Sequence, residues 1–273
     1  MKKRLITIIA TLLCVPLWAQ DPTALLLVHF GTTHDDARAR TLDVISAKAR
    51  QQYPHMTVSE CFTSAIVRKR LAARGIEKAS VVDALLQLRA NGHRSIAVQP
   101  SFIIDGKEMA LLRKDIEQVR SFFDSITLGT PLLNSIDDSQ SLCSILANRH
   151  PVNTKQKEHV LFVGHGTKGI ASAIYSQLEY MLRDSGHPNH HVATIEGYPT
   201  LQTAIKLMKE QGARQVTLVP LLFVAGDHAT NDIAVEWKAQ IEQEGIRVSV
   251  VSEGLGEIEE IQHRLITVPH DTH

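Results

Sequence analysis

The chain has 273 residues, of which 44% are hydrophobic and 21% charged, a composition typical of a globular protein with one large or two medium domains. Lysine plus arginine and aspartate plus glutamate number 29 each, so the net charge is zero and gives no support for nucleic acid as a partner. The 14 histidines are many for this length, and histidine is both a common metal ligand and a proton carrier near neutral pH.

The N-terminal segment has the pattern of a secretory signal peptide. Three basic residues precede the mostly apolar stretch 5–17, and the small Ala19 stands before a plausible cleavage point. We expect residues 1–19 to be removed on export, which predicts a periplasmic protein without stable membrane insertion. The alternative is an uncleaved anchor, but the apolar stretch is too short to span a bilayer comfortably.

The rest of the chain alternates apolar runs with segments of helical spacing. In the first half we expect strands at 24–30, 57–63, 95–104 and 125–128, and helices at 35–52, 80–90, 107–122 and 139–148. A polar stretch around Pro151 reads as a linker or surface loop. After it we expect strands at 159–163, 192–196, 215–224 and 247–251, and helices at 170–184, 200–211, 233–244 and 257–265.

This alternation predicts an α/β fold of doubly wound parallel sheets with right-handed crossovers. The predicted halves are residues 20–150 and 151–273. They also align with each other: LLVHFGTT at 26–33 matches LFVGHGTK at 161–168, and 91–108 aligns without a gap on 211–228. Because glycine, arginine and proline recur at the same places, we expect two related domains packed about a pseudo-twofold axis, with a cleft between them.

Polar side chains stand where the strands of the second half end. His165 follows the strand at 159–163, Glu196 ends VATIE, and His228 follows VPLLFVAGD. Ligands of open α/β sheets bind beyond the carboxyl ends of the strands, so these side chains are expected to converge. Each alone is better explained as a structural residue. Together, at matched positions, the two histidines and the carboxylate predict a divalent-metal site with open positions.

The first half repeats this geometry with different chemistry. Phe30 takes the place of His165, and Glu108 takes the place of His228. One half is therefore expected to supply polar ligands and the other an apolar wall. We interpret the two glycines that flank His165 as clearing space for a flat ligand. The residues expected to face that ligand are Phe30, Gly164, Gly166 and Thr167.

Other candidate motifs are weaker. The segment GHPNHHV, with three histidines at 187, 190 and 191, is compatible with metal binding but is better explained as a polar turn before a strand. GHGTKG lacks the spacing of a dinucleotide-binding loop, and no nucleophile elbow is present. Cys61 and Cys143 leave two alternatives open: one disulfide, or two separate buried thiols.

With these motifs the sequence resembles the anaerobic cobalt chelatases of the CbiK family, class II tetrapyrrole chelatases that insert cobalt into sirohydrochlorin. The resemblance covers nearly the whole chain after the leader and rests on HFGTTHDDAR, SAIVRKRL, IAVQPSFIIDGKE, LGTPLL, FVGHGT, IEGYP and VPLLFVAGDHATNDIA. It implies that His165, Glu196 and His228 bind the metal and that the fold has two α/β domains. Exported relatives imply a homo-oligomer.

One position departs from the family pattern. Family members commonly have a histidine where this chain has Phe102, in a region linked to haem binding in exported relatives. The resemblance therefore does not extend to a haem ligand at this position.

The activity implied is insertion of a divalent metal into sirohydrochlorin or a related tetrapyrrole, with Co²⁺ as the first candidate and Fe²⁺ or Ni²⁺ as others. His165 would bind the metal and accept pyrrole protons, Glu196 would support that transfer, and Glu108 would act on the opposite side of the ring. Candidates for binding the ring carboxylates are Arg38 and Lys168. The alternatives are a periplasmic protein that binds haem, another tetrapyrrole or metal for uptake, and an iron-inserting chelatase.

Overall fold

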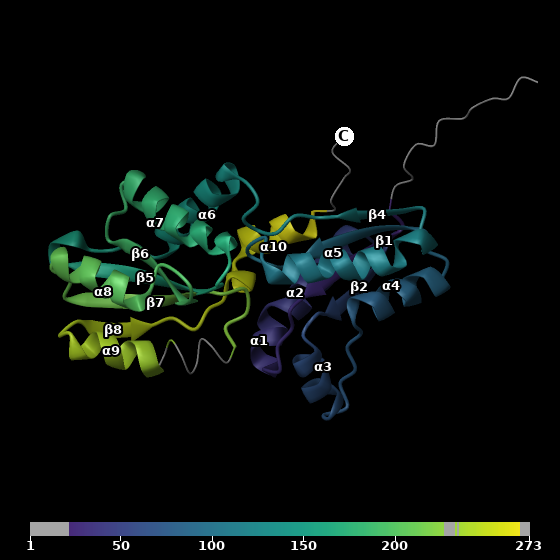
Figure 1. Ribbon diagram of the computed structural model, residues 1–273, viewed down its shortest axis with the longest axis horizontal. Helices are drawn as coiled ribbons and strands as arrows, with labels where there is room; N and C mark the ends of the chain where they lie inside the picture. Colours follow the sequence, from purple (N-terminus) through teal and green to yellow (C-terminus); the bar gives the residue numbers. More distant parts are fainter. Residues whose placement is uncertain (1–21, 227–232, 234, 268–273) are drawn as a thin grey trace, which may run out of the picture.

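The computed structural model describes residues 22–226, 233 and 235–267, which form two four-stranded parallel sheets (Figure 1). The strand order is β2-β1-β3-β4 in the first sheet and β6-β5-β7-β8 in the second. Both sheets carry helices on their two faces, as the α/β prediction requires.

The elements of the first half follow the predicted alternation. They are β1 (Ala24–His29), α1 (Asp35–Arg40), α2 (Leu42–Gln52), β2 (Thr57–Phe62), α3 (Ala65–Ala72), α4 (Val81–Ala90), β3 (Ser95–Pro100), α5 (Lys107–Val119), β4 (Ser125–Leu128) and α6 (Ile136–Arg149). The second half contains β5 (Glu158–Gly166), α7 (Ala173–Asp184), β6 (His190–Glu196), α8 (Leu201–Glu210), β7 (Gln215–Leu221), α9 (Lys238–Gln243), β8 (Arg247–Val250) and α10 (Glu259–Ile266).

The central strands are apolar because both of their faces are covered. All six residues of β1 are buried. Leu26 and Val28 pack in the cluster that contains α4 and α5 residues, whereas Leu25 and Leu27 pack in the cluster that contains α2 residues. The alternation of side chains along the strand thus gives each face its own core. In the second sheet, α6 and α7 share a core with one face of β5, and α8 and α9 share one with the other.

The internal repeat is visible in the strand register. Pro100 of β3 pairs with Val28 of β1, and Pro220 of β7 pairs with Val163 of β5, at the positions that the sequence alignment matches. The glycines that follow β1 and end β5 both have positive φ, +97° at Gly31 and +75° at Gly166. The halves therefore share strand order, register and special backbone positions.

Two helices cross between the halves. The predicted division at residues 150 and 151 falls between α6 and β5, yet α6 packs against α7 of the second half. At the other end of the chain, α10 packs against α2 and β3 of the first half, where it is seen in yellow in Figure 1. One continuous apolar cluster joins these helices to both sheets.

Some boundaries differ from the sequence prediction. The strand predicted at 159–163 continues to Gly166, so His165 lies within β5. Thr41 divides the helix predicted at 35–52, and its Oγ1 donates to the carbonyl of Ala37 at 2.6 Å, a local bond that competes with regular helix. Helix α3 was not predicted. Within the helix predicted at 233–244, residues 233 and 235–237 are π-helix and α9 begins at Lys238.

Candidate functional site

His165 and Glu196 end neighbouring strands of the second sheet. In the register of β5 and β6, Gly166 pairs with Glu196, so His165 is one residue from the paired position. Paired residues of adjacent strands lie about 5 Å apart. Both side chains are exposed, and the His165 Nδ1 lies 3.1 Å from the carbonyl oxygen of Gly166. The structure therefore places two of the three predicted ligands at one sheet edge.

Close backbone packing fixes this pair of strand ends. A Cβ at Gly166 would lie 1.8 Å from the carbonyl oxygen of Glu196, and one at Gly197 would lie 2.4 Å from that of Thr167. The loop after Glu196 folds back, because the carbonyl of Pro199 accepts from the Thr194 backbone N–H at 2.7 Å. These contacts require glycine and hold the loops after β5 and β6 against each other.

Gly164 has a packing role of its own. A Cβ there would lie 2.3 Å from Cε1 of Tyr175, a buried α7 residue whose pKa is raised to about 12 by burial. The neighbours of Gly164 and Gly166 are thus parts of the protein itself. The sequence interpretation assigned these glycines to space for a flat ligand, and that assignment stays a prediction. Thr167 forms a turn in which its Oγ1 accepts from the Gly169 N–H at 3.3 Å.

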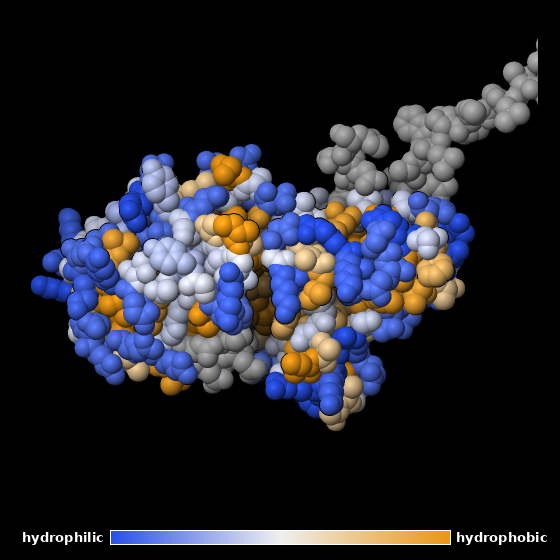
Figure 2. All heavy atoms as spheres, in the orientation of Figure 1, coloured by the Kyte–Doolittle hydropathy of each residue, from blue (hydrophilic) through white to orange (hydrophobic). Residues whose placement is uncertain are grey.

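The strand-end loops of the two halves meet. A Cβ at Gly226, in the loop after β7, would lie 3.5 Å from Oγ1 of Thr32 and 3.6 Å from Cδ2 of His34, both in the loop after β1. Phe223 and Val224 pack on the apolar cluster formed by α2, β2 and α3. Figure 2 shows a narrow recess between the halves with apolar residues in its deeper part. His228, the third predicted ligand, lies outside the described residues.

The first half presents Phe30 and Glu108 at its own strand ends. Phe30 is 50% exposed, and its role as an apolar wall opposite His165 stays a prediction. Glu108 lies in the first turn of α5, and its Oε2 accepts from Oγ1 of Thr63 at 3.4 Å. Phe102, at the position of the family histidine, is 7% exposed and belongs to the core that contains α4 and α5 residues. A buried apolar ring at this place offers no imidazole to a haem.

The two cations predicted to bind carboxylates differ. Lys168 is exposed in the loop after β5. Arg38 is mostly buried and already forms ion pairs with Asp35 at 3.0 Å and Asp43 at 3.5 Å. Arg68 of α3 is not among the predicted residues, and its Nε is buried without a hydrogen-bond partner. Its segment, SAIVRKRL, is conspicuous in the sequence, but only tertiary structure reveals an unpartnered nitrogen.

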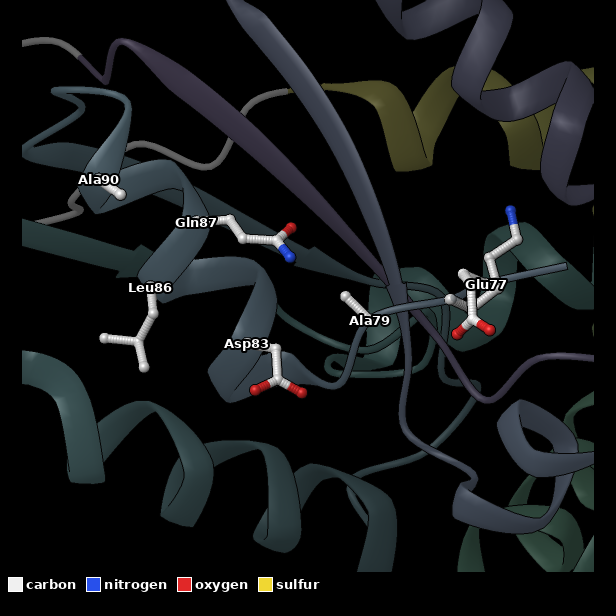
Figure 3. Close-up of a pocket in the computed structure, with 7 residues that line it drawn as sticks. Glu77, Ala79, Asp83, Leu86, Gln87 and Ala90 are labelled. Carbon is white, nitrogen blue, oxygen red and sulfur yellow. The ribbon is translucent and has the colours of Figure 1, made fainter. Parts of the chain in front are cut away.

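The predicted site is distinct from two surface hollows. A hollow of about 670 Å³ lies beside α4, and Figure 3 shows it wholly within the first half. Its lining residues are Glu77, Lys78, Ala79, Asp83, Leu86, Gln87 and Ala90. A second, of about 340 Å³, includes His187 and His190 near the start of β6. Neither contains a predicted site residue. Within the described part of the chain, no three His, Cys, Asp or Glu side chains are grouped to hold a metal ion.

The histidines at the start of β5 and β6 form internal contacts. His159 Nδ1 lies 2.9 Å from His191 Nε2, and His191 Nδ1 lies 3.4 Å from Oε1 of Glu179. His190 Nε2 is 2.8 Å from the carbonyl oxygen of His150. Burial lowers the pKa of His159 to about 4, with the charges of His191 and His190 acting in the same direction. These contacts agree with the structural interpretation of GHPNHHV.

Comparison with known proteins assigns the family. Residues 23–273 match the family described as cobalt chelatase (CbiK). The chain belongs to the CbiK cobalt chelatase family. A sirohydrochlorin cobaltochelatase of Salmonella typhimurium is 34% identical over 239 residues, covering 86% of this chain and 90% of the relative. The sirohydrochlorin cobaltochelatase CbiKC of Nitratidesulfovibrio vulgaris is also 34% identical, over 241 residues, with 86% and 85% covered.

Solved chelatase structures share the fold of this CbiK-family chain. SirB from Bacillus subtilis with Fe³⁺ superimposes with a TM-score of 0.66 at 13% identity, over 90% of this chain and 93% of the other. The sirohydrochlorin chelatase SirB of B. subtilis subspecies spizizenii in complex with cobalt gives 0.62 at 12% identity, over 90% and 92%. These likenesses support the predicted two-domain chelatase-like fold.

The described cysteines do not form a disulfide. Cys61 and Cys143 are both free and buried, and they lie in different apolar clusters, so the thiol alternative holds. Burial raises the pKa of the Cys143 thiol to about 11. None of the described helices has the length and apolar character needed to cross a membrane.

Proposed function

We propose that the chain inserts a divalent metal ion into sirohydrochlorin, with Co²⁺ as the first candidate. The observation that carries this proposal is the family match over residues 23–273, together with His165 and Glu196 at the ends of adjacent strands. Both chemical groups suit a first-row divalent ion as substrate. Fe²⁺ and Ni²⁺ are the competing ions, because such ligands bind several metals and availability decides among them.

Metal insertion exchanges one M²⁺ for the two pyrrole N–H protons of the ring, so the site must bind the ion and accept protons. In the proposed mechanism His165, Glu196 and His228 bind the ion. As the ion moves to the ring, the His165 imidazole that it leaves accepts a pyrrole proton, and the Glu196 carboxylate at the end of the neighbouring strand stabilises the imidazolium. The imidazole is exposed at the strand end, where a ring in the cleft can reach it.

The first half acts on the opposite side of the ring. Phe30 is half-exposed and offers an apolar surface to the conjugated macrocycle. Glu108, held near Thr63, is positioned to accept the second proton from that side. The repeat thus assigns the metal ligands to one half and the stacking surface to the other.

The test follows metal insertion through the change in the absorbance spectrum of the tetrapyrrole. Purified chain is mixed with sirohydrochlorin and Co²⁺, Fe²⁺ or Ni²⁺, and the rate is compared with the uncatalysed reaction. His165→Ala is expected to abolish catalysed insertion with no loss of fold. His55→Ala is the matched control. His55 is also exposed, but it precedes β2 and so lies at the amino end of a strand of the first sheet, whereas the predicted site lies at carboxyl ends. Tetrapyrrole binding by the wild type without rate enhancement would favour the alternative of a carrier for haem, tetrapyrrole or metal.

We propose further that the protein is exported to the periplasm. The support is the basic start and apolar stretch of residues 1–19, which resemble a signal peptide. Fractionation of cells that express the full chain, with N-terminal sequencing of the product, tests this. Recovery of uncleaved chain from the cytoplasm would overturn it.

A further inference from the structure

Arg68 has an unusual environment for an arginine. Its Nε is buried, and none of the hydrogen bonds or ion pairs among the described residues involves its side chain. The residue is only half-buried, and its terminal nitrogens are not among the buried unpartnered atoms, so the guanidinium reaches solvent at its far end. Leaving a buried charged donor unpaired is costly, and a planar guanidinium matches a carboxylate.

Helix α3 places Arg68 at the junction of the halves. The Ser64 N–H that begins the helix region donates to the carbonyl of Phe30 at 3.2 Å, and Arg68 N–H donates to the Ser64 carbonyl at 3.0 Å. Val67 and Leu71 of the same helix pack in the cluster that Phe223 and Val224 of the second half cover. Arg68 therefore extends from helix α3, whose start is hydrogen-bonded to the segment after β1 and whose apolar side packs against the second half.

The Arg68 charge lies near the buried thiol of Cys61. Burial raises the pKa of Cys61, near the end of β2, and the Arg68 charge opposes that rise. The carboxyl groups to consider as partners are Glu60 and Asp115, which also act on this thiol, and Glu108 in the first turn of α5. Glu60 is paired with Lys78, and Glu108 with Thr63. None of the three is within ion-pair distance of Arg68 in the described structure.

The surroundings of Arg68 suit an amphipathic anion. Residues 65–74 contain four cations and no acidic residue, and of these cations Arg74 is paired with Asp35. Phe30 and Ile66, half and two-thirds exposed at 50% and 67%, provide apolar surface beside the same helix start. A flat apolar ring with peripheral carboxylates complements both properties.

We infer that Arg68 binds a peripheral carboxylate of the tetrapyrrole and so positions the ring over Phe30. The inference rests on the proposed function and deepens it, because it assigns substrate recognition to the half that carries no predicted metal ligand. Arg68 is a substrate-positioning residue and takes no part in proton transfer.

The test compares Arg68→Gln, Arg68→Lys and Arg70→Gln with the wild type. Arg70 is the matched control, since it is an exposed arginine on the same helix. Two quantities are measured: the Kd for sirohydrochlorin without metal, and KM and kcat for Co²⁺ insertion. Loss of one charge-assisted pair predicts a rise of about tenfold or more in Kd and KM for Arg68→Gln, with kcat little changed. Arg68→Lys should lie between, and Arg70→Gln should match the wild type.

A second measurement uses ring carboxylates directly. Wild type should bind an octacarboxylate porphyrin more tightly than a dicarboxylate one, and Arg68→Gln should lose part of that preference. Unchanged Kd and KM in Arg68→Gln, or an equal loss in Arg70→Gln, would overturn the inference. If wild type binds the ring but inserts no metal, the proposed function fails while the Kd comparison still decides the role of Arg68. If Arg68→Gln does not fold, the Kd of Arg68→Lys decides in the same way, because it retains the charge but not the planar fork.

Discussion

Gly166 offers the sharpest test of how the strand ends are held together. Gly166→Ala introduces two separate costs: a side chain at φ +75°, and a Cβ that would lie 1.8 Å from the carbonyl oxygen of Glu196. Gly245→Ala is the matched control, because Gly245 has φ +79° and a Cβ there would meet nothing within 4 Å. The difference between the two variants isolates the contact from the backbone conformation.

The magnitudes follow from these two costs. Both variants are expected to lose about 1 to 2 kcal/mol from the left-handed conformation. The contact in Gly166→Ala is with backbone, which cannot rotate away, and overpacking of this kind adds about 1 to 3 kcal/mol. At about 3 °C per kcal/mol for a chain near this size, Gly166→Ala should melt about 6 °C below Gly245→Ala.

Thermal unfolding followed by circular dichroism measures the stability difference, and the metal-insertion rate measures its functional consequence. Because Glu196 must move to admit the new methyl group, Gly166→Ala should also lose more insertion activity than the control. Equal melting temperatures for the two variants would refute the claim that the contact between the loops requires glycine.

Three further predictions concern other parts of the chain. Burial lowers the pKa of His29 to about 4, more than the nearby Glu60 raises it, so below pH 6.5 the unfolded chain binds a proton that the folded chain does not. The His29 contribution should therefore lower the free energy of unfolding by about 2 kcal/mol from pH 7 to pH 5, and His29→Asn should remove that part of the slope in urea titrations. Ser135→Ala removes the side-chain half of a capping box on α6 and should cost about 1 kcal/mol, and an unchanged melting temperature would contradict this. Cys61 and Cys143 should react with a thiol reagent only after unfolding, with no prior reduction needed, because both are free and buried; rapid labelling of the native protein would disprove it.

Much of the fold could be predicted because its strands are covered on both faces. The fully buried β1 reads as a continuous apolar run, and the repeated glycines and prolines fixed the relation between halves. Helix α3 was missed because Leu71 is its only fully buried residue, and the partners of its apolar side chains, such as Phe223, come from the other half. The break at Thr41 depends on a hydroxyl bond to Ala37, a local competition that periodicity does not reveal.

The part of the candidate site that could be predicted is the part that strand topology determines, namely which residues lie at adjacent strand ends. Any polar residue at the carboxyl end of adjacent parallel strands comes to one edge, which is why His165 and Glu196 could be paired from sequence. The role of Gly164 depends on its contact with Tyr175 of a later helix. The unpartnered Nε of Arg68 depends on the absence of a nearby hydrogen-bond acceptor among the described residues. Neither property has a signature in the local sequence.

Helices α6 and α10 each pack against the half of the chain to which they do not belong by sequence, and this has a consequence for biosynthesis. The first sheet is covered on one face by α2 and by α10, so that face stays open until α10 has been synthesised. An N-terminal fragment ending after β4 would expose the apolar face that α10 covers, and a fragment starting at β5 would lack α6. We expect neither fragment to fold alone, which makes this duplicated fold a single unit that is completed only when α10 has left the ribosome.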